Sequence, residues 1–135
     1  MSVEAFDTNV LVYACDKSDA RKRQIAQRTL DTDEGVILWQ TACEFIAATR
    51  KLADQGFAPP DAWRHLGFLL ESMPLVLPNR SVLDRARVLH VEKQWSFWDA
   101  LIVAAAVEAG ANRLYSEDLP GGAPPEGLEI VNPFG

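Results

Sequence analysis

The sequence predicts one α/β domain with a parallel sheet of about five strands flanked by helices. Short apolar segments typical of strands alternate with longer segments of helical periodicity. The length of 135 residues is that of one ordinary domain, so residues 1–135 are expected to form a single unit. Hydrophobic residues make up 48% of the chain and charged residues 24%, which is typical of a globular protein.

Helix caps and prolines mark the elements of the first half. Ser18 and Asp19 are residue types that cap helices, and Thr41 precedes apolar residues at helical spacing. Gly56 can end that helix, and Pro59 can open the next one, because proline costs little in a first turn. The expected elements are a strand at 3–6, a short helix at 10–14, a helix from Ser18 or Asp19 to about 30, a strand at 36–39, and helices at 41–52 and 59–72.

The second half follows the same alternation. Ser81 is expected to cap a helix that reaches about Lys93, and Ser96 to cap the most apolar helix, which Gly110 ends. The other expected elements are a three-residue strand within 74–78, a strand at 113–115, a Pro/Gly loop at 121–127 and an edge strand at 128–131. The helix residues expected to face the core are Ile25, Leu30, Phe45, Ile46, Thr49, Trp63, Leu66, Leu69, Leu70, Leu83, Ala86 and Leu89.

Composition limits where the protein works. No apolar run reaches the roughly 20 residues that a membrane span needs, and residues 1–7 carry acids without the basic cluster of a signal peptide. Cys15 and Cys43 form no metal-ligand pattern and no disulfide framework, so we expect buried, reduced thiols. These features predict a cytoplasmic protein without membrane contact. The net charge of −6 has the wrong sign for broad nucleic-acid binding, and it favours a specific folded target over bulk RNA.

Four acids fall at one edge of the predicted sheet. Asp7 lies at the carboxyl end of the first strand and Asp118 just past a later strand, which is where open parallel sheets bind ligands. Glu44 and Asp99 lie in early turns of helices that start at the same edge. Carboxylates this close repel each other, and a hard divalent cation such as Mg²⁺ or Mn²⁺ relieves the repulsion. The pattern therefore points to metal-assisted phosphodiester chemistry.

Each acid also has a purely structural interpretation. Glu44 and Asp99 both stand three residues after a Thr or Ser, which fits a capping box. Asp7 can be a plain helix cap, and Asp118 can be a turn aspartate. The context of Asp99 favours a functional role. Residues 101–107 after it have no polar face, so the helix is expected to be buried. A charge at the start of a buried helix costs folding free energy unless it is paired or used.

Five segments together resemble the PIN-domain family and, more narrowly, the VapC-type toxins. They are FDTNVLVY at 6–13, Glu44 in an early helix, SFWDALIVAAA at 96–106, LYSEDL at 114–119 and VNPF at 131–134. The segments occur in the family's order and span nearly the whole chain. The first, third and fourth are specific in combination, although each alone is a weak signal.

The resemblance implies a PIN-like fold, in which a small twisted sheet lies between helices, and a metal-dependent endoribonuclease that is the toxin of a toxin–antitoxin pair. It implies that Mg²⁺ or Mn²⁺ is held by Asp7, Glu44, Asp99 and Asp118, with a metal-bound water attacking the RNA phosphodiester. Thr8 or Asn9, together with Ser96, is implied to support the site by hydrogen bonds, and Glu117 is an alternative or additional acid. The implied partners are RNA, a cognate antitoxin protein and a second copy of the chain.

Other side chains are candidates for binding surfaces. A basic helix face is either solvated or a track for phosphates, and it consists of Arg21, Lys22, Arg23 and Arg28, with Arg50, Lys51, Arg80, Arg85 and Arg87 as further candidates. His65 and His90 have no partner at ligand spacing and are expected to be ordinary helix residues. Trp95 and Trp98 are expected to pack in the core, with base stacking as the alternative. The apolar candidates for an antitoxin surface are Trp39, Phe45, Phe57 and Trp63.

Two other functions compete with the ribonuclease. A haloacid-dehalogenase-type phosphatase also begins with an aspartate after its first strand. It needs a second aspartate two residues later, where this chain has Asn9. It also needs a downstream lysine near the site, and the sequence offers no obvious one. A catalytically inactive PIN-like module that only binds a partner is the other alternative. The complete set of acids argues against that module.

Overall fold

Five parallel strands form the centre of the fold, which the computed structural model describes over residues 2–119 and 123–135. Strand β1 pairs with β4 and β4 with β5, while β2 pairs with β3. The strands are β1 Glu4–Phe6, β2 Ile37–Leu38, β3 Leu75–Val76, β4 Arg113–Tyr115 and β5 Glu129–Val131. The predicted small parallel sheet is therefore confirmed.

A single parallel bridge joins the two groups of strands. The amide of Glu4 donates to the carbonyl of Glu34 at 2.9 Å, and the amide of Val36 donates to the carbonyl of Glu4 at 2.8 Å. The spatial order is thus β3-β2-β1-β4-β5. Gly35 lies at this bridge, where an added Cβ would meet the Met73 sulfur at 2.8 Å, so a side chain there would have to displace the end of Met73.

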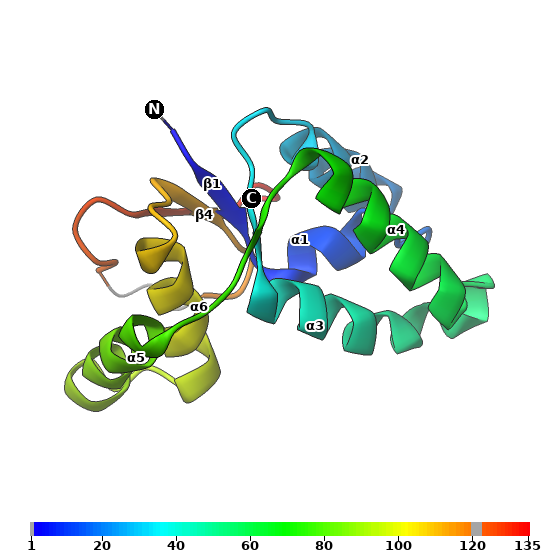
Figure 1. The fold of residues 1–135 in the computed structure, drawn as a ribbon. Coiled ribbons are helices and arrows are strands. Elements are labelled where there is room, and N and C mark those ends of the chain that lie inside the picture. Colours follow the sequence, from blue (N-terminus) through cyan, green and yellow to red (C-terminus); the bar gives the residue numbers. More distant parts are fainter. Residues whose placement is uncertain (1, 120–122) are drawn as a thin grey trace.

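Helices cover both faces of the sheet (Figure 1). Helices α5 and α6 pack on one face, around Ala5 and Leu114, and α1 to α4 pack on the other face, around Phe6 and Ile37. Ala5 and Phe6 are neighbours in β1 and serve opposite faces, as the two-residue period of a strand requires. The helices are α1 Thr8–Tyr13, α2 Ala20–Leu30, α3 Trp39–Ala48, the 3₁₀ helix η1 Thr49–Gln55, α4 Pro59–Ser72, α5 Arg80–Glu92 and α6 Phe97–Glu108.

Caps explain several helix starts and two wrong predictions. Asp19 caps α2 and Ser96 caps α6, as expected. Helix α3 instead begins at Trp39, and the Thr41 hydroxyl donates to the carbonyl of Phe6 at 2.7 Å, so Thr41 is not a cap. Helix α5 is capped by Asn79 rather than Ser81. The segment after α3 tightens into η1 and ends at Gly56, whose φ of +77° suits glycine.

Some residues expected in the core are exposed. Trp63 is 61% exposed and Leu83 57%, because α4 and α5 turn neighbouring positions inward, namely Ala62 and Val82. Both cysteines are free, but Cys43 is exposed, so its predicted burial is wrong. Cys15 is half-buried, and burial raises the pKa of its thiol to about 11.

Two further expectations concern the loop and the membrane. The loop expected at 121–127 lies partly outside the described residues, and residues 123–127 belong to no helix or strand. No helix in the two described ranges is long and apolar enough to cross a membrane.

Candidate active site

The carboxyl ends of β1 and β4 bring Asp7 beside Ser116. The Asp7 amide donates to the carbonyl of Tyr115 at 2.8 Å, which extends the strand pairing by one residue. Asp7 then caps α1, with Oδ1 accepting from the Thr8 amide at 2.7 Å. Its second oxygen, Oδ2, accepts from the Ser116 hydroxyl at 2.7 Å. The capping interpretation of Asp7 is correct, but it occupies only one of the two oxygens.

Asn9 connects α1 to the turn that follows β4. Its Nδ2 donates to Asp118 Oδ2 at 3.3 Å, and its Oδ1 accepts from the Glu117 amide at 3.4 Å. The Ser116 hydroxyl oxygen accepts from the Asp118 amide at 3.3 Å. Asn9 and Ser116 therefore fix the position of Asp118 relative to Asp7.

Glu44 reaches the same site from α3. Its Oε1 accepts from the Thr8 hydroxyl at 2.9 Å and from Gln40 Nε2 at 3.4 Å. Because Thr41 lies inside α3 and does not cap it, the capping-box interpretation of Glu44 is wrong. Thr8 and Asn9 were alternatives for supporting the site, and both side chains donate to a predicted acid, Thr8 to Glu44 and Asn9 to Asp118.

Asp99 lies in the first turn of α6. Ser96 caps this helix by accepting from the Asp99 amide at 3.3 Å. The reciprocal half of a capping box is missing, since the Asp99 carboxylate takes part in none of the hydrogen bonds found between described residues. The negative charge of Asp99 instead acts on Asp7, where it contributes to a raised pKa.

Burial raises the pKa of Asp7 above its ordinary value. Hydrogen bonds from Ser116 and Thr8 act in the opposite direction, and the negative charges of Glu44 and Asp99 raise the pKa further. The charges of two other predicted acids therefore act on Asp7. Within residues 2–119 and 123–135, none of the ion pairs involves any of the four acids.

The donor chemistry of this site fits a hard divalent cation, since the available ligands are carboxylate oxygens without a compensating positive side chain. The carboxylates are nevertheless spread apart. In the part of the chain that the structure describes, no three Asp, Glu, His or Cys side chains lie close enough together to hold a metal ion. Both oxygens of Asp7 and Oε1 of Glu44 instead accept hydrogen bonds from hydroxyl and amide groups.

Glu117 is engaged differently from the other acids. Its Oε2 pairs with Lys22 Nζ at 2.5 Å, and its Oε1 accepts from the Tyr13 hydroxyl at 2.7 Å. Burial raises the pKa of Glu117, but the hydrogen bonds from Lys22 and Tyr13 outweigh burial and leave the pKa below its ordinary value. Arg21 also bonds within the fold, to the carbonyl of Phe134 at 2.6 Å. Two residues of the predicted phosphate track are thus used internally.

Aromatic side chains divide into buried and exposed sets. Trp95 is 7% exposed and packs in the core as expected, whereas Trp98 is 62% exposed, so its predicted packing is wrong. Of the apolar residues considered for an antitoxin surface, Phe45 is buried and Phe57 half-buried, while Trp39 and Trp63 are exposed.

Sequence reasoning did not assign Ser116 or Gln40 to the site. Ser116 follows β4 just as Asp7 follows its partner β1, so strand pairing would have indicated it. Gln40 stands four residues before Glu44, which places the two side chains on one helix face.

Comparisons with known proteins identify the family and the fold. A family model described as PIN domain matches residues 5–119. A chain of a toxin–antitoxin complex from Klebsiella pneumoniae superimposes with a TM-score of 0.71 at 21% identity, covering 96% of this chain and 97% of that one. PAE2754 from Pyrobaculum aerophilum gives 0.63 at 23% identity, with coverages of 96% and 90%.

A third solved structure is VapC20 from Mycobacterium tuberculosis, described as a sarcin–ricin loop cleaving toxin. It gives a TM-score of 0.64 at 18% identity, covering 85% of this chain and 89% of that one. At these identities the three structures establish a shared fold. No curated protein sequence matches the chain significantly.

Proposed function

The chain belongs to the PIN domain family, and from this membership and the surroundings of Asp7 we propose that it is a metal-dependent endoribonuclease. The observation that carries the proposal is the environment of Asp7. A half-buried carboxylate whose pKa is raised by burial and by two like charges destabilises the fold in its ionised form, unless a cation compensates it. Such an arrangement is typical of functional sites.

The residues that would hold Mg²⁺ or Mn²⁺ are Asp7, Glu44, Asp99 and Asp118. A bound divalent ion supplies Lewis-acid activation of water and stabilisation of phosphoryl charge. Side chains and backbone amides of the protein orient the acids. Ser116 and the Thr8 amide orient the two oxygens of Asp7, and Asn9 holds Asp118.

We further propose that the enzyme is the toxin of a toxin–antitoxin pair. The fold shared with a chain of the Klebsiella complex supports this role. An apolar antitoxin segment is expected on a cavity of about 750 Å³ that α1, α2 and α4 line. The exposed Phe68 of α4 lies at this cavity, and at 72% exposure it gains most from being covered. Sedimentation of the purified protein would test the homodimer that the family resemblance implies.

One observation favours the alternative of an inactive PIN-like binding module, namely the spacing of the acids among the described residues. Cleavage of labelled RNA by purified protein separates the two functions. The ribonuclease predicts cleavage in Mn²⁺ that stops when the ion is chelated. An inactive module predicts no cleavage in either condition, and an unchanged melting temperature when Mn²⁺ is added.

A further inference from the structure

The side chain of Gln40 lies between the two helices that carry Glu44 and Asp99. Its Nε2 donates to Glu44 Oε1 at 3.4 Å and to the carbonyl of Trp98 at 3.3 Å. Glu44 belongs to α3, while Trp98 directly precedes Asp99 in α6. One amide group therefore bridges the two sides of the candidate site.

The orientation of this amide follows from its partners. A carboxylate and a backbone carbonyl can only accept hydrogen bonds, so the nitrogen must face both of them. The carbonyl oxygen of Gln40 then points the opposite way. That oxygen is buried and has no hydrogen-bond partner in the described part of the protein.

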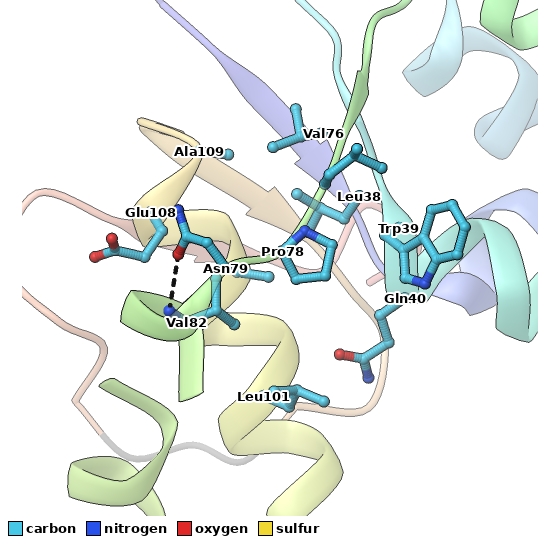
Figure 2. A pocket seen from close by; sticks show the side chains of 12 residues that line it. Leu38, Trp39, Gln40, Val76, Pro78, Asn79, Val82, Leu101, Glu108 and Ala109 are labelled. Carbon is cyan, nitrogen blue, oxygen red and sulfur yellow. Dashed lines mark hydrogen bonds between the residues drawn. The ribbon is translucent and has the colours of Figure 1, made fainter. Parts of the chain in front are cut away.

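Gln40 borders a cavity of about 210 Å³ that Trp39, Pro78 and Leu101 also line. Figure 2 shows the Gln40 amide with its oxygen turned toward the side of the view where Leu101 and Val82 are drawn, two residues that also line this cavity. Asn79, which also lines the cavity, caps α5 by accepting from the Val82 amide at 3.3 Å, the dashed line in Figure 2.

Folding stability alone does not explain a glutamine at this position. Its two hydrogen bonds are long, and its oxygen has lost water without gaining a protein donor, which costs free energy of folding. An apolar side chain of similar length would avoid that cost. Buried polar groups without a partner are found in native proteins mostly at functional sites.

We propose that Gln40 is a positioning residue for the acidic site, an inference that rests on the ribonuclease function proposed above. Gln40 and Thr8 both donate to Oε1 of Glu44, which leaves Oε2 free of hydrogen bonds from the described residues. The same amide holds the first turn of α6, where Asp99 lies, against α3. Gln40 thereby presents one oxygen of Glu44 to the site and fixes the separation of Glu44 from Asp99.

The test compares Gln40→Met with the parent protein. Methionine matches glutamine in length and lacks its polar groups, so the melting temperature without metal should equal or exceed that of the parent. RNA cleavage and the affinity for Mn²⁺, measured by the rise in melting temperature, should each fall by about 10-fold or more, as for other residues that orient metal ligands. The matched control is Gln27→Met, because Gln27 is exposed and, among the described residues, its side chain donates only to the carbonyl of Ala14.

The outcomes distinguish this inference from the function on which it rests. Cleavage and Mn²⁺ response like those of the parent would overturn the role of Gln40 and leave the ribonuclease intact. Loss of activity together with a clearly lower melting temperature would also overturn it, since that pair of results indicates a structural role. If Gln40→Met does not fold, Gln40→Ala replaces it with the same expectations for cleavage and Mn²⁺. A parent that neither cleaves RNA nor responds to Mn²⁺ would overturn both proposals.

Discussion

The hydroxyl of Ser116 donates a 2.7 Å hydrogen bond to Oδ2 of Asp7, so the ends of two paired strands are linked by their side chains as well as their backbones. This bond lowers the pKa of Asp7, whereas burial and the charges of Glu44 and Asp99 raise it, and the net result is a raised pKa. The stability of the fold and the chemistry of the site are therefore coupled at Asp7.

Asp7→Asn should stabilise the protein at neutral pH when no divalent metal is present. A carboxyl group whose pKa is higher in the folded state stabilises the fold at low pH, and this contribution is lost as the pH rises through the folded pKa. Asparagine imitates the neutral form at every pH. Thermal unfolding in chelator should show a higher melting temperature for the mutant at pH 7, with the difference disappearing below about pH 4. A mutant less stable than the parent at pH 7 would contradict this electrostatic account.

Ser116→Ala should have the opposite effect on stability. The mutation removes a hydrogen bond to a charged group, which costs about 1.5–3 kcal/mol of unfolding free energy at neutral pH. It also removes an influence that lowers the pKa of Asp7, so the acidic limb of the pH–rate profile should move to higher pH. Urea unfolding and cleavage rates across pH measure the two effects. An unshifted acidic limb would show that ionisation of Asp7 does not control cleavage.

Glu117→Gln and Asp118→Asn should separate two adjacent acids. Because the pKa of Glu117 is lowered, its stabilisation is present at neutral pH and is lost as the pH falls through the folded pKa. Glu117→Gln should therefore lower the melting temperature at pH 7, less so at low pH, and largely retain cleavage. Asp118→Asn should abolish cleavage at little cost in stability, since Asp118 is exposed. The reverse pattern would place Glu117 in the site instead of Asp118.

Trp98→Ala should weaken RNA binding. Trp98 is exposed directly beside Asp99, and stacking of one base on an aromatic ring is worth about 1–3 kcal/mol, which corresponds to roughly 5- to 150-fold in affinity. Trp63→Ala is the matched control, because Trp63 is 61% exposed against 62% for Trp98 and lies on α4. Fluorescence anisotropy of a labelled RNA loop in an Asp99→Asn background measures binding without cleavage. Equal losses in both variants would argue against stacking at Trp98.

Sequence patterns predicted most elements of the fold because strand ends and caps are local signals. Ser96, a capping residue directly before an apolar segment, predicted the start of α6. Asp7 was correctly placed at the end of β1. Thr41 was misassigned because capping-type residues also make other hydrogen bonds, here with the carbonyl of Phe6. Helical periodicity also leaves open which neighbouring position faces the core, and so the exposure of Leu83 was missed.

The hydrogen bonds of the candidate site were less accessible to sequence reasoning. Ser116 and Gln40 act across the fold, on Asp7 and on the carbonyl of Trp98, at sequence separations of 109 and 58 residues. Such contacts depend on how the helices dock on the sheet, which no local pattern encodes. The convergence of the four acids on one metal site stays a prediction, because no three of the described Asp, Glu, His or Cys side chains lie close enough together to hold an ion.

The central claim is tested most directly by cleavage of one labelled RNA by the parent and by Asp99→Asn, each with Mn²⁺ and with chelator. Asparagine leaves the cap of α6 intact, because Ser96 accepts from the backbone amide of residue 99 and not from its side chain. We predict that only the parent with Mn²⁺ cleaves, and that without metal the mutant melts no lower than the parent. Cleavage by Asp99→Asn at the rate of the parent, or cleavage by the parent in chelator, would contradict the proposed mechanism.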